Sequence, residues 1–471
     1  MKKILILSIL IIAIATTVYS LLPFRNVTTS SEKAYKHYNN GLDMGYRMFY
    51  RKAIDEFSRA VAEDPNFAMA HLMLGKYYDL ISDFDSSERH IQLAHSLTAK
   101  VSEREKLVIN YYYAELKDDS VGADSLLDIL AQKHPDTVEP HELLAHKYMR
   151  EGEHEKAIAQ YEKILDIEPN HALAYNDLAY HYLSLGKYND ALAHSERYAF
   201  ICPGQSNPLD TKGEILLHTG QYEKAIEQLE KSVEISPDFV FGWMHLAAAY
   251  AETGRLDDAE TCWDKYLELT GTDDETTWAK RQKAGIEFRR GDFKKAKKLF
   301  TEVARGDSYR NDPGLNFELG LVNLKLGNIK SARKNLSIIE KAKEDPERNF
   351  QAEYYYHKLS AEIALLEKDF KRAEEHINAA ISMISTPHGN VYNYAKLAEI
   401  QMNAGELVRA RNSVNRALSI NTNHPRSLNI LYHLYSKQGE EAKAREIKGR
   451  YLQVMGNADP EHPEVERIKN G

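Results

Sequence analysis

The chain has 471 residues, of which 43% are hydrophobic and 28% charged, and this composition is typical of a folded protein rather than a disordered one. Its formal net charge of −9 gives no reason to expect nucleic-acid binding, which usually needs a basic domain. The only two cysteines, Cys202 and Cys262, provide no disulfide framework, and we expect no bond between them.

Residues 1–24 differ in kind from the rest of the chain. Two lysines precede an apolar run from Ile4 to Ala15, as in a secretory signal peptide. The small residues Ala13 and Ala15 suit a signal peptidase, yet the uncharged stretch continues to Phe24 and is long enough to span a bilayer. A cleaved signal peptide and a retained anchor at residues 4–24 both fit. Either one places the body outside the cytoplasm, as a periplasmic, secreted or membrane-anchored protein.

After a polar spacer at residues 25–33, the chain becomes repetitive. Five alanines lie 34 residues apart, and a proline follows each of the first four by twelve residues: Ala123, Ala157, Ala191, Ala225 and Ala259, with Pro135, Pro169, Pro203 and Pro237. A period of 34 residues is the signature of a helix-turn-helix solenoid, in which each unit packs on its neighbours.

Residues 240–273 illustrate one unit. Trp243, Leu246, Ala247 and Tyr250 have the spacing of one helix face, and Leu256, Ala259, Trp263 and Tyr266 form a second apolar face. Between them, Gly254 is suited to the left-handed conformation that ends a helix. A glycine recurs five residues before the alanine of the second helix in eight units: Gly152, Gly186, Gly220, Gly254, Gly291, Gly327, Gly405 and Gly439.

These positions resemble the tetratricopeptide repeat (TPR) family. The resemblance implies an all-α fold, a right-handed superhelical solenoid of about twelve helix-turn-helix units. We place the units at 34–67, 68–101, 104–137, 138–171, 172–205, 206–239, 240–273, 277–310, 313–346, 354–387, 391–424 and 425–458, followed by a C-terminal tail at 459–471. The polar last helix, Glu441 to Gln453, is expected to cap the array, because a terminal helix has no neighbour to cover it.

The resemblance also implies that the first helix of each unit lines a concave groove, with positions 2, 5 and 9 of the unit facing inward. In units four to six these positions form a polar, somewhat acidic wall that includes Asp210 and Glu214. In units seven to nine they are mostly apolar and include Ala248, Gly285 and Gly314. The candidate partner-binding groove consists of Phe241, Met244, Trp278, Arg281, Phe317 and Leu321. The alternative is that curvature buries these side chains within the array.

Unit eight is locally basic. Between Lys280 and Lys298 there are nine basic residues against two acidic ones, Glu287 and Asp292. The candidate basic patch consists of Lys294, Lys295, Lys297 and Lys298. Such a patch would bind an acidic partner, an anionic lipid surface or a glycan in a salt-sensitive manner, and a solvated helix face is the alternative.

No nucleotide-binding, metalloprotease, hydrolase or Cys-X-X-Cys motif occurs, so we expect no catalytic residues, no metal and no cofactor. The lysine and asparagine clamp with which some TPR proteins bind chaperone C-termini is also absent. We expect a non-enzymatic protein–protein interaction scaffold or adaptor of the cell envelope that binds partner proteins or peptides in the groove. The alternative is a regulatory or sensory subunit that modulates an enzyme, or recognises a ligand, supplied by another chain.

Overall fold

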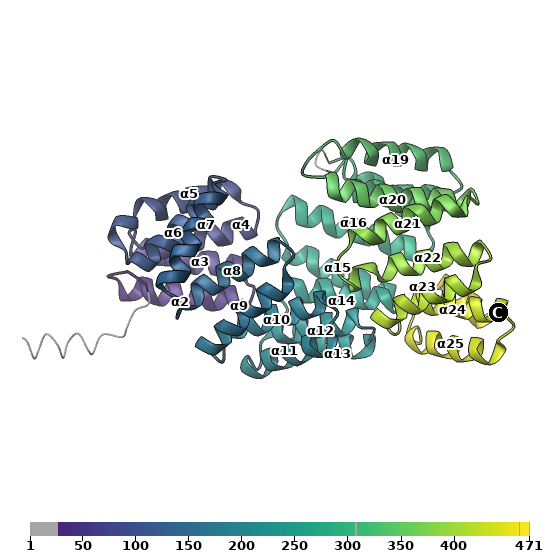
Figure 1. Ribbon diagram of the computed structural model, residues 1–471, viewed down its shortest axis with the longest axis horizontal. Helices are drawn as coiled ribbons and strands as arrows, with labels where there is room; N and C mark the ends of the chain where they lie inside the picture. Colours follow the sequence, from purple (N-terminus) through teal and green to yellow (C-terminus); the bar gives the residue numbers. More distant parts are fainter. Residues whose placement is uncertain (1–26, 307–308, 461, 471) are drawn as a thin grey trace, which may run out of the picture. The chain divides into compact units, whose positions relative to one another are not determined.

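The computed structural model describes residues 27–306, 309–460 and 462–470, and within these ranges the chain forms 25 α-helices and no strand (Figure 1). The all-α fold expected from the repeats is confirmed. The predicted export segment, residues 1–24, lies outside the described residues. In the part that is described, no helix combines the length and the hydropathy needed to cross a membrane. The chain divides into two compact units, unit one (Met1–Lys147) and unit two (Tyr148–Gly471).

Unit one contains α2 (Glu32–Tyr46), α3 (Tyr50–Glu63), α4 (Ala68–Leu80), α5 (Phe84–Ser96), α6 (Glu103–Leu116), α7 (Ser120–Lys133) and the start of α8 (Val138–Arg150), with a short 3₁₀ helix, η1 (Thr98–Lys100).

Unit two contains α9 (His154–Ile167), α10 (Ala172–Ser184), α11 (Tyr188–Ile201), α12 (Ser206–His218), α13 (Tyr222–Ile235), α14 (Val240–Glu252), α15 (Leu256–Leu269), α16 (Asp273–Arg290), α17 (Phe293–Val303), α18 (Pro313–Lys325) and α19 (Ile329–Ala342). It continues with α20 (Asn349–Leu366), α21 (Phe370–Met383), the 3₁₀ helix η2 (His388–Asn390), α22 (Val391–Asn403), α23 (Leu407–Ile420), α24 (Pro425–Lys437), α25 (Glu441–Val454) and α26 (Pro463–Asn470).

The helices from α2 to α25 form twelve consecutive hairpins, each closed by a short turn that contains one residue with positive φ. In eight hairpins this residue is the recurrent glycine, with φ between 72° and 85°. In the other four it carries a side chain: Met48, Ser82, Asp118 and Lys368, with φ between 55° and 61°. Left-handed backbone is strained for residues with a Cβ, so these four hairpins keep the same turn at an energetic cost.

The two helices of a hairpin approach closely because small residues lie between them. The alanine in the first turn of the second helix is fully buried in most hairpins, as at Ala225 and Ala259. On the first helix the facing residue is often glycine. A Cβ added to Gly213 would lie 2.6 Å from Cγ of Leu229 on the partner helix. A larger side chain at these positions would therefore overpack the hairpin, at roughly 1–3 kcal/mol.

Both ends of the described chain are packed on the repeats, which the sequence did not reveal. The spacer predicted at 25–33 is held by Thr28, whose backbone N–H donates to Glu105 at 2.7 Å and whose hydroxyl donates to the same carboxylate. The predicted tail contains α26, whose Val465 and Ile468 are buried in one cluster with Tyr451 of α25. The expectation that α25 is an uncovered cap is therefore wrong. Cys202 and Cys262 are both free thiols.

Unit two also folds back on itself. Three turns of its early hairpins meet three loops of its late hairpins, with Gly186 against Pro387, Gly220 against Asn421 and Gly254 against Met455. Each pair is separated by 201 residues in the sequence. The early turns recur every 34 residues, and so do the late loops. The alignment that brings one turn against its loop therefore brings the other two pairs together as well. We call these three meetings the fold-back contact. It joins the early hairpins, α10 to α15, to the late hairpins, α21 to α25, and these helices are labelled in Figure 1.

Polar bonds hold the fold-back contact together. The side chains of Asn421, Thr422 and Asn423 donate to the carbonyls of Leu217, Thr219 and Gly220. At the next turn, the N–H of Asp459 donates to the carbonyl of Gly254 at 3.0 Å. The carboxylate of Asp459 accepts from the N–H groups of Leu256 and Asp257 at 3.0 and 3.1 Å. Asp459 thus caps α15 from a position about 200 residues away, satisfying orphan donors at the helix N-terminus.

Candidate binding surfaces of unit two

The first helices of the hairpins form one polar face in unit two, built from contacts between neighbouring repeats. We call it the first-helix face. Its side chains pair across helices about one repeat apart: Tyr180 with Glu214, Asp210 with His245, Arg281 with Glu318, Glu362 with Lys396 and Glu399 with Arg426. The periodic fold therefore brings side chains from the first helices of successive repeats within bonding distance.

The negative charge of the acidic wall predicted for the fourth to sixth repeats is partly neutralised on this face. Asp210 is 2% exposed, and Nδ1 of His245 lies 2.9 Å from both of its carboxylate oxygens. Although burial opposes protonation, the charges of Asp210 and Glu214 raise the pKa of His245 to about 9. The wall thus carries a protonated histidine at pH 7. His245 occupies position 6 of its unit, outside the positions used to project the groove, so the sequence projection missed it.

A cation without a carboxylate partner lies further along the same face. Within the described chain Lys358 forms no ion pair, and its Nζ lies 4.9 Å from the ring centre of Phe317 and 5.0 Å from that of Tyr354. Burial, together with the charges of Arg426 and Lys396, lowers the pKa of Lys358 to about 8. An ammonium over aromatic rings is a cation–π arrangement, which stabilises the charged form in partial compensation.

The first-helix face of the early hairpins is reached by a side chain from the late ones. The hydroxyl of Tyr392 on α22 donates to Glu252 on α14 at 2.5 Å, and Arg289 of α16 donates to the same carboxylate at 2.7 Å. Both cross-linking side chains keep about two-fifths of their surface exposed. Solvent therefore reaches this junction, where a side chain of a late repeat meets two neighbouring early repeats.

The six residues of the predicted partner-binding groove are all partly buried. Trp278 packs at 4.9 Å, ring centre to ring centre, against Trp263, and Phe317 packs at 5.2 Å against Tyr355. Phe241 lies 5.9 Å from Phe239, and Met244 packs on the same hydrophobic cluster as Trp278. Arg281 is bonded to Asp312 and Glu318, and Leu321 is partly buried. Every member thus has internal packing or solvent shielding, and the binding role of the set stays a prediction.

Two groove positions of the same projection are open. Ala248 is exposed, and a Cβ added to Gly285 would meet no atom within 4 Å. Leu321 occupies the same position in the following unit. We call these three small or apolar residues the groove lane: Ala248 is exposed, and Gly285 and Leu321 are partly buried.

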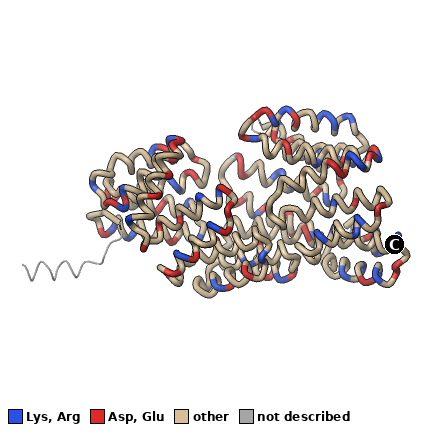
Figure 2. The backbone as a smooth tube through the Cα atoms, viewed as in Figure 1, with Lys and Arg blue, Asp and Glu red and all other residues tan. Residues whose placement is uncertain are grey.

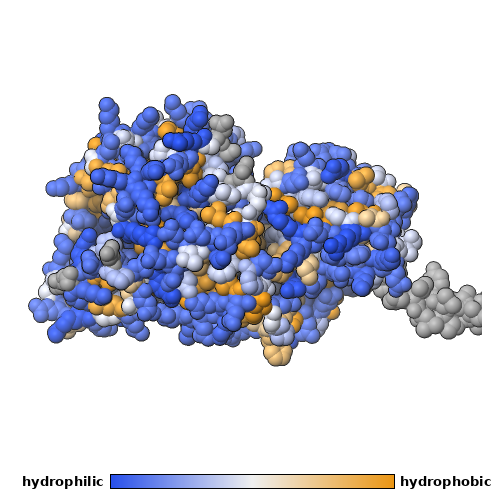
Figure 3. All heavy atoms as spheres, turned by 180° about the vertical axis from the view of Figure 1, so that it is seen from behind, coloured by the Kyte–Doolittle hydropathy of each residue, from blue (hydrophilic) through white to orange (hydrophobic). Residues whose placement is uncertain are grey.

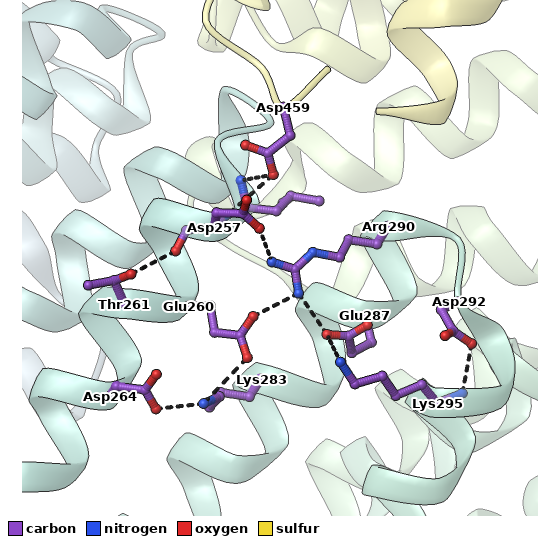
Figure 4. A network of polar contacts seen from close by, with 11 residues as sticks. Asp257, Glu260, Thr261, Asp264, Lys283, Glu287, Arg290, Asp292, Lys295 and Asp459 are labelled. Atoms are coloured by element: carbon purple, nitrogen blue, oxygen red, sulfur yellow. Dashed lines mark hydrogen bonds and ion pairs between the residues drawn. The ribbon is translucent and has the colours of Figure 1, made fainter. Parts of the chain in front are cut away.

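The basic segment of the eighth repeat is largely paired with acidic residues of the seventh repeat, as Figure 4 shows. Arg290 bonds to Asp257, Glu260 and Glu287, while Lys283 bonds to Glu260 and Asp264. Lys295, a member of the predicted patch, lies 2.9 Å from Glu287.

Three other members of the predicted basic patch form no ion pair among the described residues. We call them the unpaired lysines: Lys294, Lys297 and Lys298. Across both units basic and acidic residues are interspersed along the helices, as Figure 2 shows. The patch is therefore smaller than the sequence count suggested.

The outer surface carries hollows and scattered apolar residues. A hollow of about 440 Å³ between α13, α14 and α15 has an apolar floor that includes Trp243 and Tyr250 and an acidic rim that includes Glu230 and Asp258. The face drawn in Figure 3 is mostly hydrophilic, with hydrophobic patches separated by polar residues. No feature of the described chain identifies an occupant for these patches.

Two family models match unit two. One, described as a tetratricopeptide repeat, matches residues 148–199, and the other, described as a TPR repeat, matches residues 213–265. The chain carries tetratricopeptide repeats. No curated protein matches the chain.

Solved structures similar to the chain include other repeat proteins. A tetratricopeptide repeat protein from Parabacteroides merdae is 17% identical, with a TM-score of 0.44 over 56% of this chain and 98% of that one. The human IFIT1 dimer with m7Gppp-AAAA is 15% identical, with a TM-score of 0.47 over 92% of this chain and 97% of that one. The Cut9–Hcn1 complex is 14% identical, with a TM-score of 0.35 over 93% and 97%. Repeats of this family generally mediate protein–protein interaction, so we take this TPR protein to have protein partners.

Proposed function

We propose that this TPR protein is a non-enzymatic scaffold or adaptor of the cell envelope that binds segments of partner proteins along the first-helix face of unit two. The lane formed by Ala248, Gly285 and Leu321 supports the proposal most directly. At Gly285 no atom of the protein lies within 4 Å of where a Cβ would be, so the lane has room there for an apolar group of a partner. Ion pairs such as Arg281–Glu318 flank the lane. Apolar contacts inside a polar rim are the usual composition of a protein interface.

The signal-like segment at residues 1–24 supports the envelope location. Sequencing the mature N-terminus tests this part of the proposal. A start near Thr16 or Leu21 indicates a secreted or periplasmic protein, an intact N-terminus in the membrane fraction indicates an anchored one, and recovery in the cytosol contradicts export.

Two glycines allow a matched test of groove binding. Gly285 in α16 and Gly449 in α25 both lie inside helices, and a Cβ at either would meet no atom within 4 Å. Replacing either by tryptophan should therefore preserve the fold, since leaving glycine in a helix interior gains up to about 1 kcal/mol. Only Gly285→Trp fills the groove lane.

The readout is crosslinking in intact cells, followed by identification of the captured proteins. We expect Gly285→Trp to lose partners that the natural chain and Gly449→Trp both retain. Equal recovery from all three proteins would refute binding along this lane. Circular dichroism of each variant checks that the helices are intact.

A further inference from the structure

The late side of the fold-back contact carries three histidines, one in each loop that approaches an early turn. His388 begins η2, His424 precedes α24 and His462 precedes α26. His424 and His462 are 2% and 9% exposed, and His388 is partly buried. In each of the three, one ring nitrogen is buried without a hydrogen-bond partner: Nδ1 of His388, Nε2 of His424 and Nδ1 of His462.

Each ring packs on the early hairpins or on a residue that reaches them. The ring of His388 lies 4.9 Å from that of His218, a residue of the early hairpins. The ring of His424 lies edge-on at 4.6 Å to Tyr392, the residue that bonds Glu252.

The third ring, His462, reaches the last of the three early turns. Cδ2 of His462 would lie 3.0 Å from a Cβ added to Gly254.

The charged groups around these rings give little support to a protonated form. His388 faces two further histidines, His218 and His154, against one carboxylate, Glu214. His424 faces two arginines, Arg289 and Arg426, against Glu252.

At His462 the nearby charged groups are mixed. The ring faces Glu464 and Asp459, with Arg289 opposing them.

Burial dominates at all three sites. It lowers the pKa of His388 and of His424 to about 4, and it lowers the pKa of His462 below the usual value for histidine. Exposure of the rings to water on opening would return their pKa toward 6.5. The closed form is thus favoured above pH 6.5, and it loses stability as the pH falls from 6.5 toward 4.

We propose that mild acidification opens unit two at the fold-back contact, because His388, His424 and His462 can take up protons only when the early and late hairpins separate. The individual hairpins remain folded. The first-helix face at the Tyr392–Glu252 junction becomes open to partner segments. This regulation goes beyond the scaffold function, and its test measures opening directly, so it is independent of whether a partner binds.

The size of the effect follows from the linkage between proton binding and opening. For a group whose pKa rises from about 4 to 6.5, the opening equilibrium increases about 20-fold between pH 7 and pH 5. His388 and His424 together give roughly 400-fold, and His462 adds to it.

Hydrogen exchange of the full-length protein provides the readout. The amides of Leu256, Asp257 and Asp459 donate only across the fold-back contact, so their protection reports its closure. After correction for the intrinsic pH dependence of exchange, we expect their protection to fall at least 100-fold between pH 7 and pH 5. Amides inside α23 should keep their protection, because the hairpins stay folded.

Variants separate the histidines from other acid effects. The triple variant H388Q/H424Q/H462Q should keep the contact closed at pH 5, whereas H194Q, which removes a histidine whose ring packs on Tyr175 and Tyr182 of α10, should open like the natural chain. If the triple variant does not fold, H388Q and H424Q are tested singly, and each should lose about 20-fold of the response. Unchanged protection in the natural chain at pH 5, or an unchanged pH response in the glutamine variants, would overturn the proposal.

Discussion

The fold-back contact makes a specific prediction about two glycines that have the same backbone conformation. Gly220 and Gly405 both have left-handed backbone, with φ of 81° and 82°. A Cβ on Gly220 would lie 2.3 Å from Oδ1 of Asn421 and 2.9 Å from the backbone nitrogen of Asn423. A Cβ on Gly405 would meet nothing within 4 Å. Gly220→Ala and Gly405→Ala therefore share the backbone cost, and only the first obstructs the contact.

The expected difference can be estimated from the bonds that the obstruction breaks. Left-handed alanine costs roughly 1–2 kcal/mol in either variant. In Gly220→Ala the loop at residues 421–423 must move, because Asn421 is 7% exposed and has no room to turn aside. The three hydrogen bonds that the side chains of this loop donate to the early hairpins are then lost, at about 1 kcal/mol each. We expect Gly220→Ala to destabilise unit two by about 3 kcal/mol more than Gly405→Ala.

Urea denaturation followed by tryptophan fluorescence measures this difference in unit two alone. All three tryptophans of the chain, Trp243, Trp263 and Trp278, belong to that unit. Hydrogen exchange at Asp459 should show whether the next turn opens as well. Equal destabilisation by the two substitutions would refute the reasoning, because it would mean that the fold-back contact contributes nothing to stability.

The remaining predictions concern the turns, the groove and the basic patch. Ser82→Gly and Lys368→Gly should each stabilise the protein by about 1 kcal/mol in thermal unfolding, since glycine relieves the strain of positive φ, and a loss of stability would contradict this. Phe241→Ser with Phe317→Ser should abolish partner capture while leaving the helical signal intact, whereas collapse of the fold would assign these side chains to the core alone. Replacing the three unpaired lysines by glutamate should weaken binding to an anionic polymer such as heparin, with the difference vanishing at high salt. An identical affinity at low salt would show that the patch is only a solvated helix face.

Much of the local structure could be predicted because it depends on short-range chemistry that repeats. The glycine at the turn and the alanine five residues later fix each hairpin, since one needs a left-handed backbone and the other a close helix approach. Four turns escaped the glycine pattern at Met48, Ser82, Asp118 and Lys368, yet they adopt the same conformation. There the packing of two apolar faces overrides the local preference of one residue.

The candidate site was less predictable, because the position of a residue in the repeat predicts its helix face but not the side chain with which it pairs. Arg281 was projected as a groove residue, and its two carboxylate partners lie 31 and 37 residues further along the chain. The pairing of Arg290 with acidic residues of the preceding repeat reduced the local positive charge counted between Lys280 and Lys298 in the same way. Counting charges along one unit could not show this, since neighbouring units supply the opposite charges.

The sequence by itself determined the repeating hairpin, because a helix, its turn and its close packing depend on residues within about 34 positions. Only the tertiary structure decided that the early turns of unit two meet the late loops at a separation of 201 residues. The curvature that brings them together accumulates from small rotations at every repeat, and no single residue encodes it. The same 34-residue interval that identified the hairpins then keeps the three meetings in register.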